Sequence, residues 1–277
     1  MSLTLMKTLL IATLAAAVVP AQSAAPTPTL QCNENGWHVN GLETFCKMVE
    51  IPALFGGSLS VSTTNGSITI RAWDGPDMLV RAQINTAAST TFGAESLAAL
   101  VSIDVSAGHV QASGPPNTMY QNWSLSYEIF LPHTADLSLN TANGAIAITD
   151  VQGRIQFNIA NGAVSLVRLA GQVDGKIANG ALAITLGGDH WDGAGLDVKT
   201  ANGAITINTP HDYSAHFDAS TTVGTVSTNY PVAVQTRNGK WGFPGLGGCL
   251  TFDAGIGGAP IRVSTVVGTI RIQRASG

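Results

Sequence analysis

The feature that most constrains this chain is a short phrase, Ala-Asn-Gly-Ala followed by an aliphatic residue, that recurs along its middle. The glycines of its four best copies lie 18, 18 and 23 residues apart, and three looser copies extend the series in both directions. A period of this size predicts a repeat architecture, in which each unit buries its apolar face against its neighbours. The turn residues of the seven copies are Asn65, Gly66, Asn143, Gly144, Asn161, Gly162, Asn179, Gly180, Asn202, Gly203, Gly224 and Gly268.

After each glycine, large apolar residues alternate with small or polar ones. In the second copy, Ile146 and Ile148 fall on one side of the expected strand, while Ala145 and Ala147 fall on the other. This alternation predicts a β-strand with one buried face, and the segment before each turn alternates in the same way. Because Asn and Gly tolerate positive φ, each turn predicts a sharp change of direction between two strands.

Two arrangements of these strands fit the sequence. An Asn-Gly turn between alternating runs is the strongest local hairpin signal, which would build an antiparallel meander. Identical phrases 18 residues apart instead favour stacked coils, with Asn143, Asn161 and Asn179 above one another at one corner. We favour the stack because the inward residues match from copy to copy, and we leave its handedness open. Val223 and Val267 replace the asparagine in two copies, which favours a structural role for the turns over a catalytic one.

The composition is typical of a turn-rich β protein, since only 11% of the residues are charged and 31 are glycine. The one convincing helical stretch after the N-terminal segment is residues 94–102. We therefore predict an all-β fold, a β-solenoid or β-helix-like stack of strand, Asn-Gly turn and strand, with one short helix. The net charge of −4 and the lack of a basic run argue against nucleic acid as a partner.

Residues 1–24 are typical of a secretory signal, in which Lys7 supplies the charge and Pro20 ends the apolar run. That run is too short to span a bilayer, so we expect no stable membrane span once the signal is removed. We expect an exported protein, located in the periplasm, at the cell surface or outside the cell. Residues 25–50 are expected to form a linker and a leader with two cysteines, and residues 51–277 the repeat domain.

The cysteines fit an exported chain. Cys32 and Cys46 are 14 residues apart, and an oxidising compartment permits a disulfide between them. Cys249 is left over and is expected to behave as a small buried hydrophobe, with its redox state left open.

No motif for a metal protease, a nucleophile elbow or a phosphate loop occurs, so we predict no catalytic residues, no metal and no cofactor. The most suggestive segment contains Asp189 and Asp192, with Asp197 nearby, among glycines that faintly resemble calcium-binding loops. Because this pattern occurs once, we favour a solvated loop in which Trp191 packs on the repeats. The alternative function is a carbohydrate-active enzyme, a polysaccharide hydrolase or lyase, whose acids would cluster in a groove. Other acids near turns are Asp136, Asp150 and Asp174.

Aromatic side chains offer a second possibility, a face that binds a sugar or a peptide. Such residues are more often part of the core or its rim. The candidates are Trp73, Trp123, Trp191, Trp241, Tyr120 and Tyr127.

Several phrases together resemble the bacterial putative-adhesin domains built of β-strand repeats, a domain family of unknown function. They include residues 65–73, 123–127, 196–205 and 257–262, and the resemblance spans roughly residues 51–275. The resemblance implies an exported β-solenoid-like domain with a surface or adhesive role, and it supplies no catalytic residues. The sequence thus predicts a non-catalytic binding or scaffold module whose ligand is an envelope or surface component, either protein or glycan.

Overall fold

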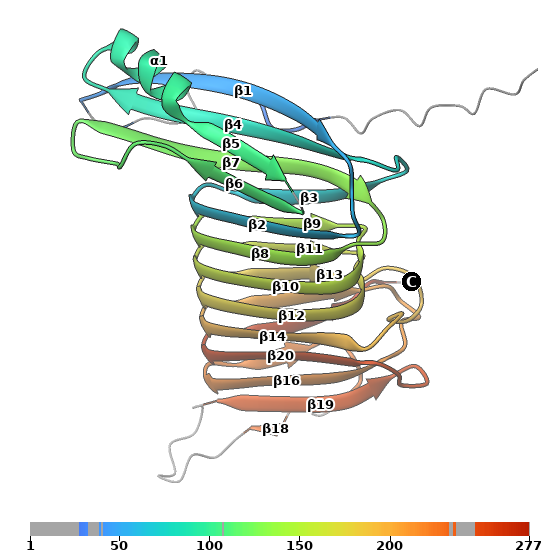
Figure 1. The fold of residues 1–277 in the computed structure, drawn as a ribbon. Coiled ribbons are helices and arrows are strands. Elements are labelled where there is room, and N and C mark those ends of the chain that lie inside the picture. The colour runs from blue at the N-terminus through green and yellow to red at the C-terminus, as the bar shows by residue number, and fades with distance from the viewer. Residues whose placement is uncertain are drawn as a thin grey trace, which may run out of the picture.

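The computed structural model describes residues 28–32, 39, 41–106, 108–232, 235–236 and 247–276, which form two large β-sheets and one helix (Figure 1). Sheet A contains, in spatial order, β1 (Glu43–Ala53), β4 (Met78–Ala88), β7 (Gln121–Pro132), β3 (Ile68–Trp73), β9 (Ile146–Thr149), β11 (Val164–Val167), β13 (Leu182–Thr185), β15 (Ile205–Thr209), β21 (Ile270–Arg274) and β17 (Val226–Thr228). Sheet B contains β18 (Gln235–Thr236), β19 (Gly248–Ala254), β16 (Ala215–Val223), β20 (Pro260–Val267), β14 (Gly195–Asn202), β12 (Ala170–Asn179), β10 (Gln152–Asn161), β8 (Asp136–Asn143), β2 (Ser58–Asn65), β6 (His109–Ser113) and β5 (Ser102–Ser106). The prediction of an all-β chain with one short helix is confirmed.

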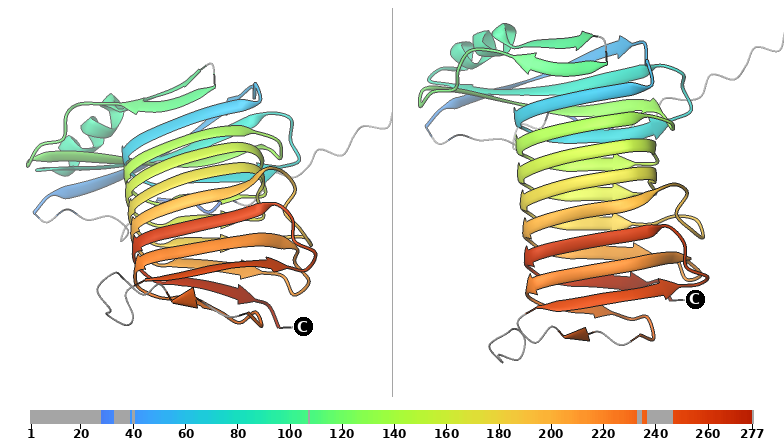
Figure 2. Two further views of the ribbon diagram at one scale, coloured as in Figure 1. Left: turned by 90° about the horizontal axis from the view of Figure 1, so that it is seen from below. Right: turned by 60° about the horizontal axis from the view of Figure 1, so that its bottom comes forward.

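Each repeat contributes one strand to each sheet. The chain leaves sheet B at the end of β8, turns at Gly144 and enters sheet A as β9, so the Asn-Gly turn joins strands of different sheets. Equivalent strands of successive repeats pair in parallel, with Ile155 opposite Leu137 in sheet B and Val164 opposite Ile146 in sheet A. The repeats therefore do not pair as the antiparallel meander that the turn chemistry alone allowed. Figure 2 shows the strands piled in regular layers.

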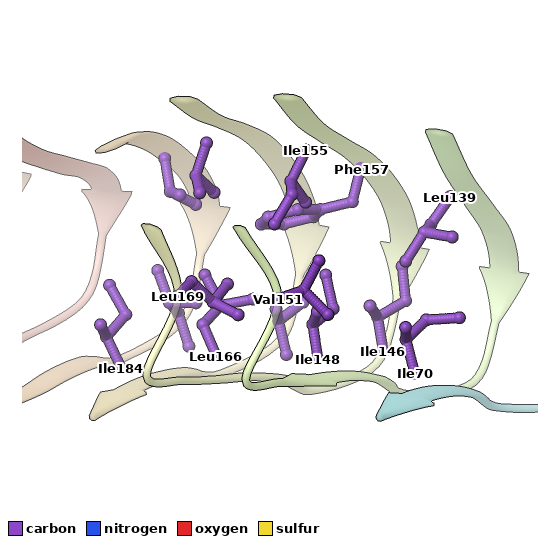
Figure 3. Packing of buried hydrophobic residues seen from close by; sticks show 14 of the residues in the cluster. Ile70, Leu139, Ile146, Ile148, Val151, Ile155, Phe157, Leu166, Leu169 and Ile184 are labelled. Atoms are coloured by element: carbon purple, nitrogen blue, oxygen red, sulfur yellow. The ribbon is translucent and has the colours of Figure 1, made fainter. Parts of the chain in front are cut away.

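The apolar core lies between the two sheets. Ile146 and Ile148 of β9 point inward and are fully buried, and Figure 3 shows them opposite Leu139 and Ile155 from sheet B. Burying each such side chain contributes roughly 1.5–3 kcal/mol, so stacking of coils is the main source of stability. The alanines that flank Ile146 point outward, as the alternation predicts.

The N-terminal end departs from the repeat. Between the first two repeats the chain forms β4, the helix α1 (Thr91–Leu100) and the strands β5 to β7, and β4 pairs with β1 and β7 in antiparallel fashion. The side chain of Thr90 caps α1 by accepting the Gly93 N–H at 3.0 Å. The domain boundary expected at residue 51 falls inside β1, because the leader already pairs with β4. Cys32 and Cys46 form a disulfide that ties the leader to β1.

The C-terminal end departs in a different way. In space, β20 and β21 lie between the fifth repeat (β14 and β15) and the repeat that follows it in sequence (β16 and β17). Figure 1 shows β20 between β14 and β16. Val263 of β20 is in parallel register with both Val198 of β14 and Ala219 of β16. The last coil of the chain is thus inserted before the preceding one, and β19 covers β16 as an antiparallel strand.

Candidate functional site

The glycines of the seven turns form one column along the corner where the chain passes from sheet B to sheet A. All seven have positive φ, from 140° at Gly66 to 159° at Gly268. A Cβ atom on Gly162 would overlap the carbonyl group of Gly144 in the coil before it, and each of the other six would meet a backbone carbonyl just as closely. These positions require glycine for space as well as for conformation.

The asparagines beside these glycines form a continuous ladder of side-chain hydrogen bonds. Asn143 Nδ2 donates to Asn65 Oδ1, and Asn161, Asn179 and Asn202 each donate in the same way to the asparagine before them, all at 3.0 Å. The ladder stops where a valine is in register with the last asparagine. The predicted turn residues therefore lie together in space, and four of the five asparagine amides donate to the asparagine before them.

The acidic loop does not gather its carboxylates. His190 Nδ1 lies 2.6 Å from Asp189 Oδ1, and this hydrogen bond holds the pKa of the Asp189 carboxyl below its usual range. Asp192 accepts a hydrogen bond from a glutamine of β10 at 3.3 Å, whereas Asp197 pairs with Lys199 at 3.4 Å. Within the residues that the structure describes, no three His, Cys, Asp or Glu side chains are grouped to hold a metal ion.

The remaining acids also have local partners. Asp136 accepts a backbone N–H of β10 at 2.8 Å, and Asp150 pairs with Arg168 at 2.6 Å. Asp174 and Asp197 are paired in register on β12 and β14, on the outer face of sheet B. That carboxylate pair lies on an open strand surface and belongs to neither of the two cavities described below.

The six aromatic candidates do not share one exposed face. Tyr127 and Trp191 are buried in the core, and the indole Nε1 of Trp191 donates to the Gly171 carbonyl oxygen at 3.0 Å. Trp123 is half-buried near the N-terminal end of the stack. Trp241 lies outside the described residues.

A cavity of about 430 Å³ opens instead at the C-terminal end of the stack. Its floor is made by Tyr230 and Phe252, whose ring centroids are 5.1 Å apart, and Phe252 stacks on the buried ring of Phe217 at 5.2 Å. Four segments supply the lining: residues 211–214, 230–232 and 252–256, and Arg274 at the end of β21. Arg274 meets the other three segments because β21 belongs to the inserted coil.

Charged groups surround the mouth of this C-terminal cavity. The guanidinium carbon of Arg274 lies 5.8 Å from the centroid of the tyrosine ring in the floor, and Arg274 Nε donates to the His211 carbonyl oxygen at 2.6 Å. His211 Nδ1 lies 2.6 Å from an Asp212 carboxylate oxygen, and His216 Nδ1 lies 2.7 Å from Asp253 Oδ1. Cation–π contact and short hydrogen bonds thus hold the rim in place.

Two further residues complete the C-terminal cavity. Tyr213 is buried in its wall, and burial, aided by Tyr230 and Asp189, raises the pKa of the Tyr213 phenol above its usual range, so the phenol stays neutral. Ile256 at the mouth is 99% exposed. No sequence pattern indicates this site, since its residues are spread from 211 to 274 and none forms a recognised motif.

A family model described as Toastrack DUF4097 matches residues 48–242, well over half of the chain. The chain belongs to the Toastrack DUF4097 family. The resemblance to a repeat-built domain family of unknown function is therefore confirmed. In the described part of this Toastrack chain, no helix is both long and apolar enough to cross a membrane.

Several solved structures align with most of the Toastrack chain. A putative cell adhesion protein from Clostridium sporogenes is 12% identical, with a TM-score of 0.39, and the alignment covers 84% of this chain and 100% of that one. A putative adhesin from Bacteroides fragilis is 14% identical (TM-score 0.31, coverage 82% and 97%). A putative lipid binding protein from Parabacteroides distasonis is 10% identical (TM-score 0.32, coverage 83% and 97%). Similarity at this level carries no argument about what the Toastrack chain binds. No curated protein matches it.

The C-terminal cavity of the Toastrack chain has the chemistry of a binding site. An aromatic floor accepts the apolar face of a ligand, while charged and polar groups at the rim bind its hydrogen-bonding edge. Sugars and amphipathic peptide side chains both present such a pair of surfaces.

Proposed function

We propose that this protein is an exported, non-catalytic β-solenoid that works as a binding or scaffold module, with its ligand held in the C-terminal cavity. The observation that carries the proposal is the combination of an aromatic floor, a charged rim and the fully exposed Ile256 at one mouth. Because Ile256 lines the cavity at its mouth, a ligand bound there would cover this exposed side chain. The ligand is a component of the cell envelope or surface, either protein or glycan.

The solenoid part of the proposal is supported by the parallel pairing of successive repeats and by the column of corner glycines. Export is supported by the disulfide between Cys32 and Cys46, because disulfides persist in oxidising compartments. The predicted signal, residues 1–24, lies outside the described residues. The enzyme alternative has no comparable support, because Asp174 and Asp197 are half-buried on neighbouring strands, with Lys199 beside Asp197, and line neither of the two cavities.

The test is an array of envelope glycans and peptides probed with the mature protein and with two matched variants. Ile256→Ser removes the exposed side chain at the mouth, and Leu54→Ser removes an aliphatic side chain that is 89% exposed in the turn between β1 and β2. Both variants should keep the wild-type melting temperature, since neither side chain is packed.

The proposal predicts that Ile256→Ser weakens binding of the ligand found on the array while Leu54→Ser leaves it unchanged. Equal binding by the two variants would contradict the placement of the site. No ligand at all for the folded wild-type protein would contradict the binding function itself.

A further inference from the structure

A second cavity, of about 270 Å³, lies at the N-terminal end of the stack, where the asparagine ladder begins. It is formed by the last residues of β2, by β6 and by the loop that leads into β7. In parallel register, β6 follows β2 only as far as Ser62, opposite Gln111, and then turns away. The end of β2, residues 63–65, therefore faces this N-terminal cavity instead of a neighbouring strand.

The ladder delivers a hydrogen-bond donor to this cavity. Every asparagine amide in the ladder donates its Nδ2 to the coil before it, and Asn65 Oδ1 accepts the last of these bonds, from Asn143. Among the described residues, Asn65 Nδ2 has no acceptor, and Asn65 lines the cavity. Because hydrogen bonds in a chain polarise one another, the donor that ends the ladder suits a strong acceptor, such as an amide carbonyl oxygen.

One wall of the N-terminal cavity is a preorganised indole. Trp123 Nε1 donates to the Pro115 carbonyl oxygen at 2.6 Å, and the amide of Asn117 bonds both backbone groups of Trp123, at 2.8 and 3.1 Å. Gly114 packs on the indole so closely that an added Cβ would lie 3.1 Å from it. A ring fixed before binding loses little entropy when a ligand packs against it. The indole thus offers a rigid apolar surface beside the Asn65 donor.

We propose that the N-terminal cavity binds an acetamido-bearing sugar. The acetamido carbonyl oxygen accepts from Asn65 Nδ2, the apolar face of the pyranose ring packs on Trp123, and the ring hydroxyls bond the polar side chains of Thr64 and Gln111. An extended peptide is the less suitable occupant, because strand addition needs a longer free edge than residues 63–65 provide. This site lies at the opposite end of the molecule from the C-terminal cavity and does not rest on the function proposed there.

Calorimetric titration of the full mature protein tests the proposal with two matched disaccharides. Diacetylchitobiose and cellobiose share one skeleton and differ in the acetamido groups. The wild type should bind diacetylchitobiose and should bind cellobiose at least roughly tenfold more weakly, the loss expected for one unmade hydrogen bond. Equal binding of the two sugars would overturn the proposal, and so would binding of neither sugar.

Two variants locate the interaction. Asn65→Asp keeps an acceptor for Asn143 but replaces the donor with an anion, and it should weaken diacetylchitobiose binding by roughly tenfold or more. Asn202→Asp makes the same substitution at the far end of the ladder, where it also removes the bond to Asn179, and it should bind like the wild type. Equal affinity of these two variants would place the sugar elsewhere and overturn the proposal.

A spectroscopic measurement on the wild type does not depend on how any variant folds. Diacetylchitobiose should shift the side-chain amide resonances of Asn65 in an NMR titration, while those of Asn202 stay in place. Unmoved Asn65 resonances at saturating sugar would overturn the proposal. Binding of N-acetylalanine methylamide without binding of the sugar would overturn it too, in favour of a peptide site.

Discussion

The middle repeats and the last coils of this protein are built from the same corner, yet they differ in what they leave for a ligand. From β8 to β15, each Asn-Gly turn is hydrogen-bonded to the turn of the next coil in two ways. The asparagine side chains form the ladder, and a backbone N–H donates to a carbonyl oxygen, as Gly144 N–H does to Asn161 O at 3.0 Å. In the last coils the glycines remain but valines replace the asparagines, and the order of coils changes. The C-terminal cavity opens at the other ends of these strands, away from the glycine corner. The glycine column is therefore the requirement of the stack, and the asparagine ladder is an addition to it.

The N-terminal end is stabilised by a third kind of interaction, which involves a buried carboxylate. Here Glu128 of β7 is buried on the outer face of sheet A, under the leader, and its carboxylate accepts the backbone N–H groups of Thr29 and Leu30 at 3.0 to 3.1 Å. Arg81 donates to the same carboxylate at 3.0 Å. Buried charge thus holds the leader at this end, whereas the middle of the stack relies on apolar packing. Both cavities lie where the regular repeat breaks.

The largest effect is expected from the glycine column. Gly162→Ala places a Cβ against the Gly144 carbonyl at a φ of 148°, and it should destabilise the fold by about 3 kcal/mol or more. Gly56→Ala is the control, since its Cβ would meet nothing within 4 Å, and it should change the free energy of unfolding by less than about 0.5 kcal/mol. Urea denaturation of both variants measures the difference in unfolding free energy. Equal losses would contradict the claim that the stack requires its glycine column.

A smaller loss of unfolding free energy, which depends on pH, is expected when Glu128 is substituted. Burial raises the pKa of this carboxyl, but the hydrogen bonds from Thr29 and Leu30 and the charge of Arg71 outweigh it, so the pKa in the folded protein lies below the usual range. Glu128→Gln should cost about 1–3 kcal/mol at pH 7. Glu50→Gln, a control with a half-exposed carboxylate bonded to the same Arg81, should cost less than about 1 kcal/mol.

The sign of the pH dependence follows from the lowered pKa of Glu128. The stabilisation is present above the pKa of an unfolded Glu, about 4.3, and is lost as the pH falls through the lower folded pKa. The gap in unfolding free energy between wild type and Glu128→Gln should therefore shrink below about pH 4. A gap that stays constant down to pH 2 in denaturation curves would show that the carboxylate charge does not hold the leader.

The smallest change in stability is expected when an asparagine is introduced at a corner where a valine stands, and it compares the two kinds of corner directly. Val267 is in register with Asn202 and is 46% exposed, so Val267→Asn lets a new amide donate to Asn202 Oδ1. The gain should be about 0.5–1 kcal/mol. Val266→Asn, at the neighbouring exposed position, adds the same side chain outside the ladder and should give no gain. A thermal melt in which both variants behave alike would show that the ladder does not contribute to stability.

Periodicity made the regular part of the fold predictable. Ile146 and Ile148 alternate with alanines, and the Asn-Gly turns recur at constant spacing, so each local signal agrees with the global stack. Two departures from the regular stack were not indicated by any local sequence pattern. The excursion from β4 to β7 pairs strands with no repeat phrase, and the insertion of β20 before β16 involves a coil with the same pattern as its neighbours.

The candidate sites depend on these departures. Tyr230, Phe252 and Arg274 meet at the C-terminal cavity only because β19 and the inserted coil bring distant segments to one corner. The acids near Asp189 were visible in sequence, but their spacing along the chain did not determine that each would find a separate partner. Clustering across a fold is set by the order of its strands, which no local pattern records.

The order of the last coils is the most direct test of the account. In a Cys249→Ser background, Lys199→Cys combined with Ser264→Cys should form a disulfide under mild oxidation, because the two positions are in register on adjacent strands. Lys199→Cys combined with Ser220→Cys should remain reduced, since those positions lie two strands apart, about 10 Å. Peptide mass mapping would identify the bonds. A disulfide in the second pair and none in the first would mean that the coils stack in sequence order, which would contradict the inserted coil and the cavity it completes.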